Sequence, residues 1–467
     1  MKLVWFRNDL RVVDNHALFY ACEKADASGV MAVAVITPQQ WMLQDESKAR
    51  VQFWLANLHS LKEELSSLNI PLKVIYTDTN KQIPHELLGL VERYAISELY
   101  FNREYPDYEM NRDRQVESAL MTKGVNCHSF DSDAVLPPGS VLSLKGEPYR
   151  VFTPFSRAWR KRYLTLMPEL LRAPSKQVEL SIVSDSVPTE VASHQVGADW
   201  KKHLWPAGTD QAHKRLKQFV TEKHGSYLQQ RDFPELQANS GISPYLNTGV
   251  LSVRQCLAAL QSYSDDPEWF QQQWVTELIW REFYRHILVQ WPELNRWKPF
   301  KPEIEDKLAW QYNAELFQAW CKGETGFAIV DAGMKELLET GFMHNRVRMV
   351  CASFLTKLLR QDWRLGAQFF MQHLIDGDFA SNLGGWQWSA SVGADAAPYF
   401  RIFNPLRQAE RFDKAGVYCS NWVPELKGLS SLKQHDPMLS IPLGRPEPII
   451  DYAAERKASL ALYSSRG

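Results

Sequence analysis

The chain has 467 residues, of which 45% are hydrophobic and 23% charged, and its formal net charge at pH 7 is −1. A chain of this length exceeds the size at which a single core keeps growing, so we expect two domains and space for a large buried site. The apolar start Leu3–Phe6 is interrupted at Arg7, which is too short for a signal peptide, and no run approaches the length of a membrane span. These features exclude a membrane protein and predict a globular, cytoplasmic one, with a monomer as the default state.

The cysteines and the distribution of charge narrow the class of protein further. The six cysteines stand singly, without a Cys-x-x-Cys pair or a Cys/His cluster of ligand spacing, so we expect reduced thiols, no disulfide framework and no metal site. Residues 1–140 carry 14 Lys and Arg against 19 Asp and Glu, which leaves 39 against 35 for residues 141–467. Only three of the 17 tryptophans precede Trp159. The later, more basic part is therefore the expected polyanion binder.

The first third of the chain alternates short apolar runs with helical ones. Strands are expected at Leu3–Phe6, Val30–Thr37, Leu72–Thr77 and Glu98–Phe101, and Ala49–Leu68 carries the single apolar stripe of a helix. This alternation predicts an α/β domain with a doubly wound parallel sheet over residues 1–135. No Gly-x-Gly-x-x-Gly follows the first strand, so a standard dinucleotide site is not expected there.

Residues 136–207 are expected to connect this domain to a second one, because the polar tract Ala173–Gly197 lacks helical periodicity. The basic and aromatic stretch Arg150–Arg162 within the connection is either a nucleic-acid surface or, as we favour, the snorkelling face of a helix. From residue 208 to 467 no strand-like alternation interrupts the helical periodicity, which predicts an all-α domain. Its helices are expected at Gln211–His224, Glu268–Gln290, Glu315–Lys322, Ala328–Thr340, Asn345–Arg360 and Trp363–Leu374.

The densest mixed chemistry stands in His373–Pro405. Thirteen residues hold two carboxylates, an amide, a glycine pair and two tryptophans, at Asp376, Asp378, Asn382, Gly384, Gly385, Trp386 and Trp388. Glycine allows close approach of a ligand, and Asp and Asn bind ring edges, so the stretch predicts a ligand site. The alternative is that Asp-Gly-Asp forms a turn and Trp-x-Trp a core element.

Three further stretches carry candidate site residues. In Trp274–Arg285, the side chains of Glu277, Trp280, Arg281 and Tyr284 share one helical face, which indicates either a polar ligand or an amphipathic helix with a Glu–Arg pair. In Met343–Met349, Asn345 and Met349 share a face, and one of Arg346 and Arg348 is free to meet phosphate while the other pairs with a carboxylate such as Asp376. The loop Tyr227–Gly249 suits a diphosphate, although Ser243 followed by Pro244 is also a helix start.

These stretches resemble the photolyase/cryptochrome family, most closely the bacterial class I cyclobutane pyrimidine dimer photolyases. The resemblance runs from Leu3, in LVWFRNDLR, to about Asp413 and is densest from Tyr227 onward. It implies an N-terminal α/β antenna domain and a C-terminal helical domain that holds FAD. The implied activity is that of a lyase that repairs pyrimidine dimers in UV-damaged DNA by light-driven electron transfer from excited, reduced FAD.

By this resemblance, specific positions acquire expected roles. The flavin contacts would be Tyr227, Asn239, Ser240, Gly241, Ile242, Ser243, Trp274, Arg281, Asn345, Arg348, Asp376, Asp378 and Asn382. The catalytic pocket for the dimer would be formed by Glu277, Trp280, Asn345, Met349 and Trp388, with Asn382 facing flavin N5. The DNA contacts would be Arg231, Arg346 and Gln408 together with Glu277, Trp280 and Asn345. Trp386, Trp363 and Trp310 match the electron-transfer chain, and because residues i and i+2 point to nearly opposite sides, Trp386 and Trp388 should serve different surfaces.

The chain departs from the family pattern at several positions. Asn239 stands where Thr is usual, and Gly241 where a larger residue is often found. Glu109 matches the carboxylate that binds a folate antenna, yet Tyr108 stands where Asn is expected and Gln44 where the closest relatives carry His. Methenyltetrahydrofolate is the expected antenna, with a deazaflavin or an empty site as alternatives.

The alternative function is that of a cryptochrome-like blue-light sensor without repair activity. Such a sensor would be expected to carry a long C-terminal extension and usually a different neighbour of flavin N5. Here about 54 residues follow Asp413, and Asn382 is kept, as in photolyases. The resemblance therefore favours the enzyme.

Overall fold

The computed structural model describes residues 1–191, 196–264, 266–308 and 310–464. Contacts divide the chain into two compact units. Unit 1 comprises Met1–Gln195, Trp200–His224 and Ser240–Asn295, and unit 2 comprises Val196–Asp199, Gly225–Asn239 and Arg296–Gly467. The predicted domain limits at residues 135 and 207 remain a prediction, because these units are groups of contacts and not sequence domains.

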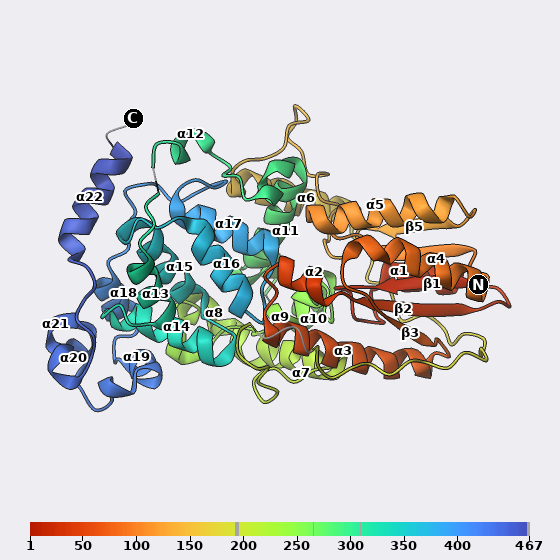
Figure 1. Ribbon diagram of the computed structural model, residues 1–467, viewed down its shortest axis with the longest axis horizontal. Coiled ribbons are helices and arrows are strands. Elements are labelled where there is room, and N and C mark those ends of the chain that lie inside the picture. The colour runs from red at the N-terminus through yellow and green to blue at the C-terminus, as the bar shows by residue number, and fades with distance from the viewer. Residues whose placement is uncertain (192–195, 265, 309, 465–467) are drawn as a thin grey trace. The chain divides into compact units, whose positions relative to one another are not determined.

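Unit 1 contains a parallel sheet with the strand order β3-β2-β1-β4-β5 (Figure 1). The strands are β1 (Lys2–Phe6), β2 (Val30–Ile36), β3 (Leu72–Tyr76), β4 (Glu98–Asn102) and β5 (Asn126–Phe130). Lys2 of β1 lies opposite Val30 on one side and Glu98 on the other. The predicted doubly wound α/β fold is confirmed, because the strand order reverses its direction beside β1.

The sheet is buried on both faces, as expected for parallel strands joined by helices. On one face, Leu3, Val33 and Leu99 belong to a core cluster that α4 (Ile83–Tyr94) and α5 (Asp107–Met121) complete. The other face is contacted by α1 (His16–Glu23) and α3 (Lys48–Ser67). The carboxyl ends of the strands are left for polar residues.

The sequence analysis did not predict β5. This strand lies at the edge of the sheet and is only partly buried, so its sequence, NCHSF, lacks the apolar run of the central strands. The opposite edge, β3, is covered by the polar tract that the sequence indicated as a connection. Asp185 accepts a hydrogen bond from Val74 N at 3.0 Å, and Asp185 N donates to Leu72 O at 2.8 Å.

Unit 1 also contains further helices, most of them from later in the chain. They are α2 (Pro38–Leu43), α6 (Phe152–Leu166), α7 (Thr209–Gln218), α9 (Ser243–Asn247), α10 (Val253–Tyr263) and α11 (Gln273–Gln290). Their attachment to the sheet is polar and buried: Arg254 of α10 donates from Nε to both carboxylate oxygens of Asp14, at 3.1 and 2.9 Å. Within residues 150–162, α6 buries Trp159 while Arg160 donates to Phe270 O, so the stretch is a helix with a packed face, and its interpretation as a snorkelling face stays a prediction.

Unit 2 is helical, as predicted. Its helices are α8 (Tyr227–Gln230), α12 (Pro302–Glu305), α13 (Ala314–Lys322), α14 (Ala328–Thr340), α15 (Asn345–Ser353), α16 (Trp363–His373), α17 (Phe379–Ala390), α18 (Pro405–Phe412), α19 (Val417–Trp422), α20 (Ser431–His435), α21 (Pro437–Ser440) and α22 (Tyr452–Ser464). Its described residues contain no strand, only an isolated bridge between Gln311 and Gln361. The helix expected at Asn345–Arg360 ends at Ser353 and continues as a π-helical turn, Phe354–Leu358.

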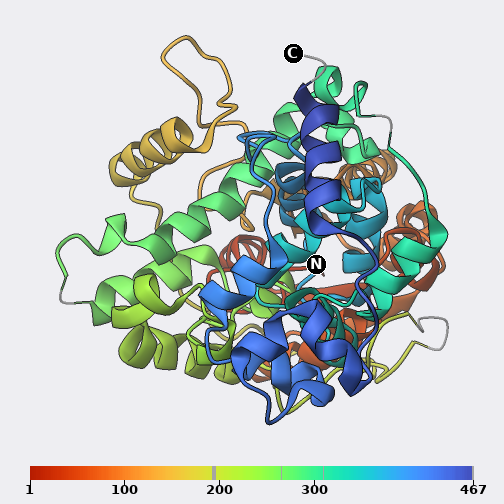
Figure 2. The same ribbon diagram turned by 90° about the vertical axis from the view of Figure 1, so that its left-hand side faces the viewer.

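Aromatic side chains form part of the core of unit 2. The rings of Trp320, Phe370 and Trp386 contact one another with centroid distances of 4.9 to 6.0 Å. The C-terminal helix α22, dark blue in Figure 2, packs against the π-helical turn. No helix among the described residues combines the length and apolar content needed to cross a membrane.

Candidate functional site

The stretch 376–390 contains both a turn and a helix start. Its interpretation as a ligand site and its interpretation as a turn followed by a core element are therefore compatible. Asp378 is the N-cap of α17 and accepts a hydrogen bond from Ser381 N at 2.8 Å. Asp376 accepts two hydrogen bonds from Nη2 of Arg348, at 2.9 and 3.0 Å. Nδ2 of Asn382 donates to Ala367 O at 2.9 Å, which fixes the orientation of its amide.

The two arginines of α15 diverge as the sequence predicted. Arg348 pairs with the buried Asp376, whereas Arg346 lies 2.8 Å from a carboxylate oxygen of Asp232. His344 is the N-cap of α15 and accepts from Arg346 N. His344 is therefore a capping residue.

The face of α15 that carries Asn345 and Met349 is continuous. Nδ2 of Asn345 lies 4.0 Å from Sδ of Met349, one turn later. Asn345 is exposed and Met349 half-buried, so both are available to a ligand. An amide beside a polarisable thioether suits a flat polar ring.

Trp386 and Trp388 of α17 occupy different environments, as expected for residues two positions apart. Trp386 is buried, and its ring lies where a Cβ on Gly366 would be, with Cη2 only 2.1 Å from that position. Trp388 is half-buried. The structure therefore separates an interior tryptophan from one that is partly accessible.

Trp310 and Trp363 meet at one carboxylate. The indole N–H groups of Trp310 and Trp363 donate to the same oxygen of Glu305, at 2.9 and 3.3 Å. Trp386 packs against Gly366, one helical turn after Trp363. The sequence analysis missed Glu305, because an isolated glutamate in a short polar segment carries no signal.

Three of the six predicted DNA contacts, Arg231, Arg346 and Gln408, belong to one region of unit 2. Arg231 and Arg346 both lie near Asp232, and the guanidinium of Arg346 lies 4.5 Å from the ring centroid of Phe412. Gln408 is on α18 one turn before Phe412, and its Oε1 is buried without a hydrogen-bond partner. Their cationic charge is partly compensated by Asp232.

In unit 1, α11 presents its predicted residues in different surroundings. Trp274 is buried against Phe219, with ring centroids 4.8 Å apart, whereas Glu277 and Trp280 are half-buried. Arg281 donates to the backbone oxygen of Asp133 at 2.9 Å and to its carboxylate. Burial opposes ionisation of that carboxylate, but Arg281 and Arg285 outweigh this effect and hold the pKa of Asp133 well below its usual range.

Trp280 is held by an aromatic partner that the sequence analysis did not name. The rings of Trp280 and Phe152 are stacked with centroids 3.7 Å apart and an interplanar angle of 6°. Phe152 begins α6, inside the stretch interpreted as a structural helix. The orientation of the Trp280 ring is therefore set by a residue 128 positions away.

The predicted phosphate loop is divided between the units, with Tyr227 and Asn239 in unit 2 and 240–243 in unit 1. Ser243 is the first residue of α9, and Ile242 is the N-cap. Gly241 has φ +62°, and a Cβ there would lie 2.6 Å from Nη1 of Arg215. Glycine is thus favoured by the left-handed backbone, and the neighbouring Arg215, which the sequence analysis had not selected, would have to move to admit a side chain.

The two predicted antenna residues, Tyr108 and Glu109, lie in different surroundings. Tyr108 is 55% exposed, whereas Glu109 accepts a hydrogen bond from Gln44 and its second carboxylate oxygen is buried without a partner. Burial and the nearby Glu104 raise the pKa of Glu109 to about 7, against the opposing effect of Arg112. The structure brings Glu109 together with Gln44 and leaves Tyr108 at the surface.

Glu109 lines a cavity of about 60 Å³ at the carboxyl ends of the strands. Its walls include Arg7, Trp41, Arg50 and Glu104. A volume of this size holds a few water molecules, whereas pockets for larger ligands measure about 300 to 1,000 Å³. A fused-ring chromophore bound against Glu109 would therefore lie partly outside this cavity or move its side chains.

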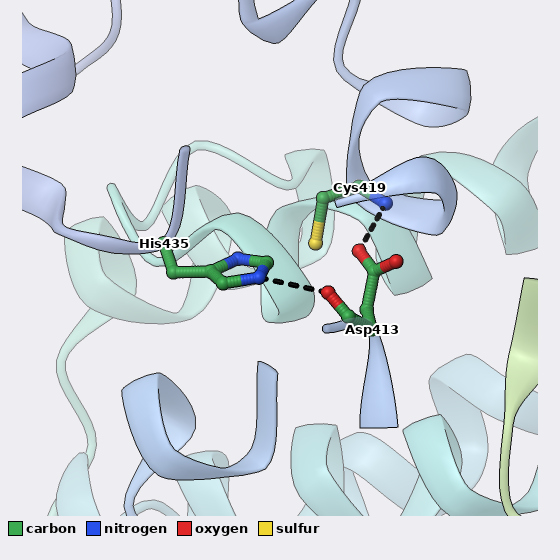
Figure 3. Close-up of side chains that lie close together, drawn as sticks. All are labelled: Asp413, Cys419 and His435. Carbon is green, nitrogen blue, oxygen red and sulfur yellow. Dashed lines mark hydrogen bonds between the residues drawn. The ribbon is translucent and has the colours of Figure 1, made fainter. Parts of the chain in front are cut away.

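A second polar cluster in unit 2 joins Asp413, Cys419 and His435 (Figure 3). The side chains are buried, and one potential metal-ligating atom from each lies within 4.8 Å of the others. However, the carboxylate of Asp413 accepts from Tyr418 N and Cys419 N at 2.9 and 2.8 Å, and Nε2 of His435 lies 2.8 Å from Asp413 O. These hydrogen bonds assign the cluster a structural role in joining α18, α19 and α20.

Comparison with known proteins places this geometry in a family. Residues 2–175 match the family described as DNA photolyase, and residues 274–465 match the FAD binding domain of DNA photolyase. The deoxyribodipyrimidine photo-lyase of Salmonella typhimurium is 41% identical over 99% of this chain and 98% of its own length. That of Escherichia coli is 40% identical with the same coverage.

The chain belongs to the photolyase/cryptochrome family. A class III photolyase from Agrobacterium tumefaciens has the same fold, with a TM-score of 0.86, 32% identity and coverage of 100% of this chain and 97% of its own. A cryptochrome from Synechocystis has a TM-score of 0.81 and 25% identity, with 99% of each chain covered. Like its family, the chain acts on DNA and binds FAD.

Each unit, taken by itself, carries groups of the kind that bind part of a flavin dinucleotide. In unit 1, the backbone N–H groups of Ser240, Gly241 and Ile242 donate no hydrogen bond within the described part of the chain, and Arg215 lies beside them. Free amides next to a guanidinium suit a diphosphate. In unit 2, the Arg348–Asp376 pair and the amide of Asn382 offer donors and acceptors of the kind that bind ring edges.

Proposed function

We propose that this protein is a deoxyribodipyrimidine photo-lyase that uses light to split cyclobutane pyrimidine dimers in UV-damaged DNA. The observation that carries the proposal is full-length identity of about 40% to relatives with that name. The proposed compartment is the cytoplasm, and the proposed working form is a monomer. A light sensor without repair activity is the outcome that would replace it.

The residues proposed to hold FAD form two groups, one for the phosphates and one for the ring system and the sugar. The loop formed by Asn239, Ser240, Gly241, Ile242 and Ser243, with Tyr227, would hold the phosphates, since its hydroxyl and N–H groups are hydrogen-bond donors. Arg348, Asp376, Asp378, Asn345 and Asn382 would contact the ring system and the sugar, with Trp274 and Arg281. When bound and reduced, FAD supplies an electron donor that light can excite.

The proposed dimer pocket combines aromatic walls with polar groups. Trp280, whose plane Phe152 fixes, and Trp388 would provide the walls. Glu277, one turn before Trp280, would hydrogen-bond a pyrimidine edge and donate a proton to the radical anion that develops there, or stabilise that anion. Asn345 and Met349 would form the remaining surface.

The dimer has to leave the base stack to reach such a pocket, and photolyases are among the enzymes for which this extrusion is described. Arg231, Arg346 and Gln408 are proposed to hold the DNA backbone, because they lie in one region and two of them are cationic. Such contacts position the duplex without reading its sequence.

Trp386, Trp363 and Trp310 are proposed to carry electrons inward when the resting protein is photoreduced. Supporting this role, Trp386 is buried and Trp310 is half-buried. The proposed antenna is methenyltetrahydrofolate bound against Glu109, whose unpaired carboxylate oxygen is a buried acceptor, with Tyr108 at the rim. A deazaflavin or no antenna remains the alternative.

The test uses chemically reduced protein and an oligonucleotide that contains one thymine dimer. Thymine absorbance should return under blue light and not in matched darkness. A Glu277→Gln variant should bind FAD normally but repair about tenfold more slowly or worse, because an amide cannot donate a proton to the radical anion of the dimer. Flavin binding without light-dependent repair would support the sensor.

A further inference from the structure

One carboxylate connects two of the proposed electron carriers. Indole has a single N–H donor, and both Trp310 and Trp363 direct theirs to Oε1 of Glu305, at 2.9 and 3.3 Å. Glu305 ends the short helix α12 and is only 9% exposed. A buried carboxylate that accepts from two indoles is more specific than packing alone requires.

The same carboxylate is paired with a guanidinium. Arg364 donates to Oε1 and Oε2 of Glu305, at 2.5 and 3.1 Å, and also to Asp362. Its Cζ lies 4.6 Å from the ring centroid of Trp363. Trp363 therefore has a cation at its ring face and an anion at its N–H, whereas Trp310 shares the anion.

This arrangement affects the two indoles differently when one loses an electron. Positive charge on an indole is stabilised by a carboxylate at its N–H and destabilised by a nearby cation, and both effects are stronger in a buried site than in water. At Trp363, the negative charge of Glu305 compensates the positive charge of Arg364. Because Arg364 lies over the Trp363 ring, positive charge is favoured on Trp310, which is half-buried, over Trp363, which is fully buried.

We propose that Glu305 is a positioning residue of the tryptophan chain: its carboxylate orients the two indoles and stabilises positive charge on them, while Arg364 favours transfer of that charge from Trp363 to Trp310. The inference rests on the proposed function, in which these tryptophans carry electrons. In the step, oxidised Trp363 receives one electron from Trp310. Trp363 becomes neutral, Trp310 keeps its N–H proton and becomes a radical cation, and a thiol reductant in solution returns the electron to Trp310.

The test compares Glu305→Gln with wild type in the FAD-loaded protein. The amide keeps the shape and one acceptor oxygen but removes the charge. Photoreduction with a thiol should slow by about tenfold or more, and transient absorption should show a shorter-lived tryptophan radical. In 15N–1H spectra recorded in the dark, the indole signals of Trp310 and Trp363 should shift. Glu303→Gln, which removes an exposed charge from the same helix, is the matched control.

A second variant distinguishes an effect of the charge of Glu305 from an effect of its structural support. In Glu305→Gln/Arg364→Met the net charge of the group formed by positions 305, 362 and 364 returns to its wild-type value, so photoreduction should be faster than in Glu305→Gln alone. A purely structural role predicts a slower rate in the double variant. If Glu305→Gln alone does not fold, photoreduction by the double variant provides the test.

The outcomes distinguish the two proposals. Repair by chemically reduced protein bypasses the tryptophans, so a wild-type protein that fails to repair refutes the proposed function and not the role of Glu305. A wild-type photoreduction rate in Glu305→Gln, or no recovery in the double variant, overturns the role of Glu305.

Discussion

Gly366 determines how closely α16 can approach Trp386. A Cβ at this position would lie 2.1 Å from Cη2 and 2.4 Å from Cζ3 of Trp386, and 2.6 Å from Cδ2 of Leu355. Neither neighbour is a flexible surface group, since both are buried. The position therefore excludes a side chain for a reason that the sequence alone does not reveal.

We predict that Gly366→Ala lowers the free energy of unfolding by about 1 to 3 kcal/mol and slows photoreduction, because Trp386 must move. Denaturant unfolding and flavin absorbance under light measure the two effects. The control is Gly385→Ala in α17, where a Cβ meets nothing within 4 Å. This control should be neutral or slightly stabilising, because alanine favours the helix by up to about 1 kcal/mol. Equal behaviour of the two variants would contradict the packing argument.

A second prediction concerns Asn382. Asn382→Asp replaces the N–H donor to Ala367 O by a carboxylate, which cannot donate when ionised. We expect folding to survive with a loss of about 1 to 3 kcal/mol, while the reduction behaviour of the flavin changes. Absorbance spectra during stepwise reduction measure it. Spectra and reduction identical to wild type would remove the assignment of Asn382 beside the flavin.

At the scale of elements, the C-terminal end of α17 is held by two other segments. Nζ of Lys357, in the π-helical turn, donates to Oγ of Ser391 at 2.6 Å, and the hydroxyl of Tyr463, in α22, donates to Ala390 O at 2.9 Å. Nζ of Lys357 also lies 4.0 Å from the ring centroid of Tyr463. The helix that carries the candidate site residues therefore depends on a buried lysine and on α22.

This lysine predicts a pH dependence. Burial lowers the pKa of Lys357 to about 7, whereas the unfolded value is about 10.4. Between these values the unfolded chain binds a proton that the folded chain does not, so the stability of wild type relative to Lys357→Met should rise with pH, by at most about 1.4 kcal/mol per unit. Below about pH 7 both states hold the proton and the difference should be constant.

Denaturant unfolding of both proteins at several pH values from about 6 to 10 provides the check. Lys433→Met, which removes an exposed lysine of α20, should parallel wild type throughout. Curves for wild type and Lys357→Met that stay parallel above pH 7 would show that Lys357 is not desolvated as described.

How well the position of a helix or strand can be predicted from the sequence depends on the source of that element's stability. The four predicted strands are short apolar runs, and helices such as Ala328–Thr340 have periodic apolar faces, so the sequence predicts their positions. The edge strand β5 and the π-helical turn were not, because hydrogen bonds to neighbours and not local pattern stabilise them. Helical geometry predicted that one of Arg346 and Arg348 pairs with a carboxylate such as Asp376, but not which one. Glu305, Phe152 and Arg215 act through contacts between distant segments, which one sequence does not reveal.

At the scale of the whole molecule, association with DNA depends on a few cations in an almost neutral chain. Arg231→Ala and Arg346→Ala should each weaken binding and reduce the slope of log affinity against log salt by up to about 0.9. Asp232→Asn should act in the opposite direction, because Asp232 compensates both arginines. Arg407→Ala, which removes an exposed arginine of α18, is the control. Salt slopes unchanged in both arginine variants would show that these residues are structural.

The most direct measurement for the central claim is the action spectrum of repair: the dimers split per incident photon, recorded as a function of wavelength with the purified, reduced protein. The account predicts that repair requires light and that its wavelength dependence follows the absorption of the chromophores bound to the protein. Splitting of dimers in darkness, or a protein that holds its flavin and splits no dimer at any absorbed wavelength, would contradict it.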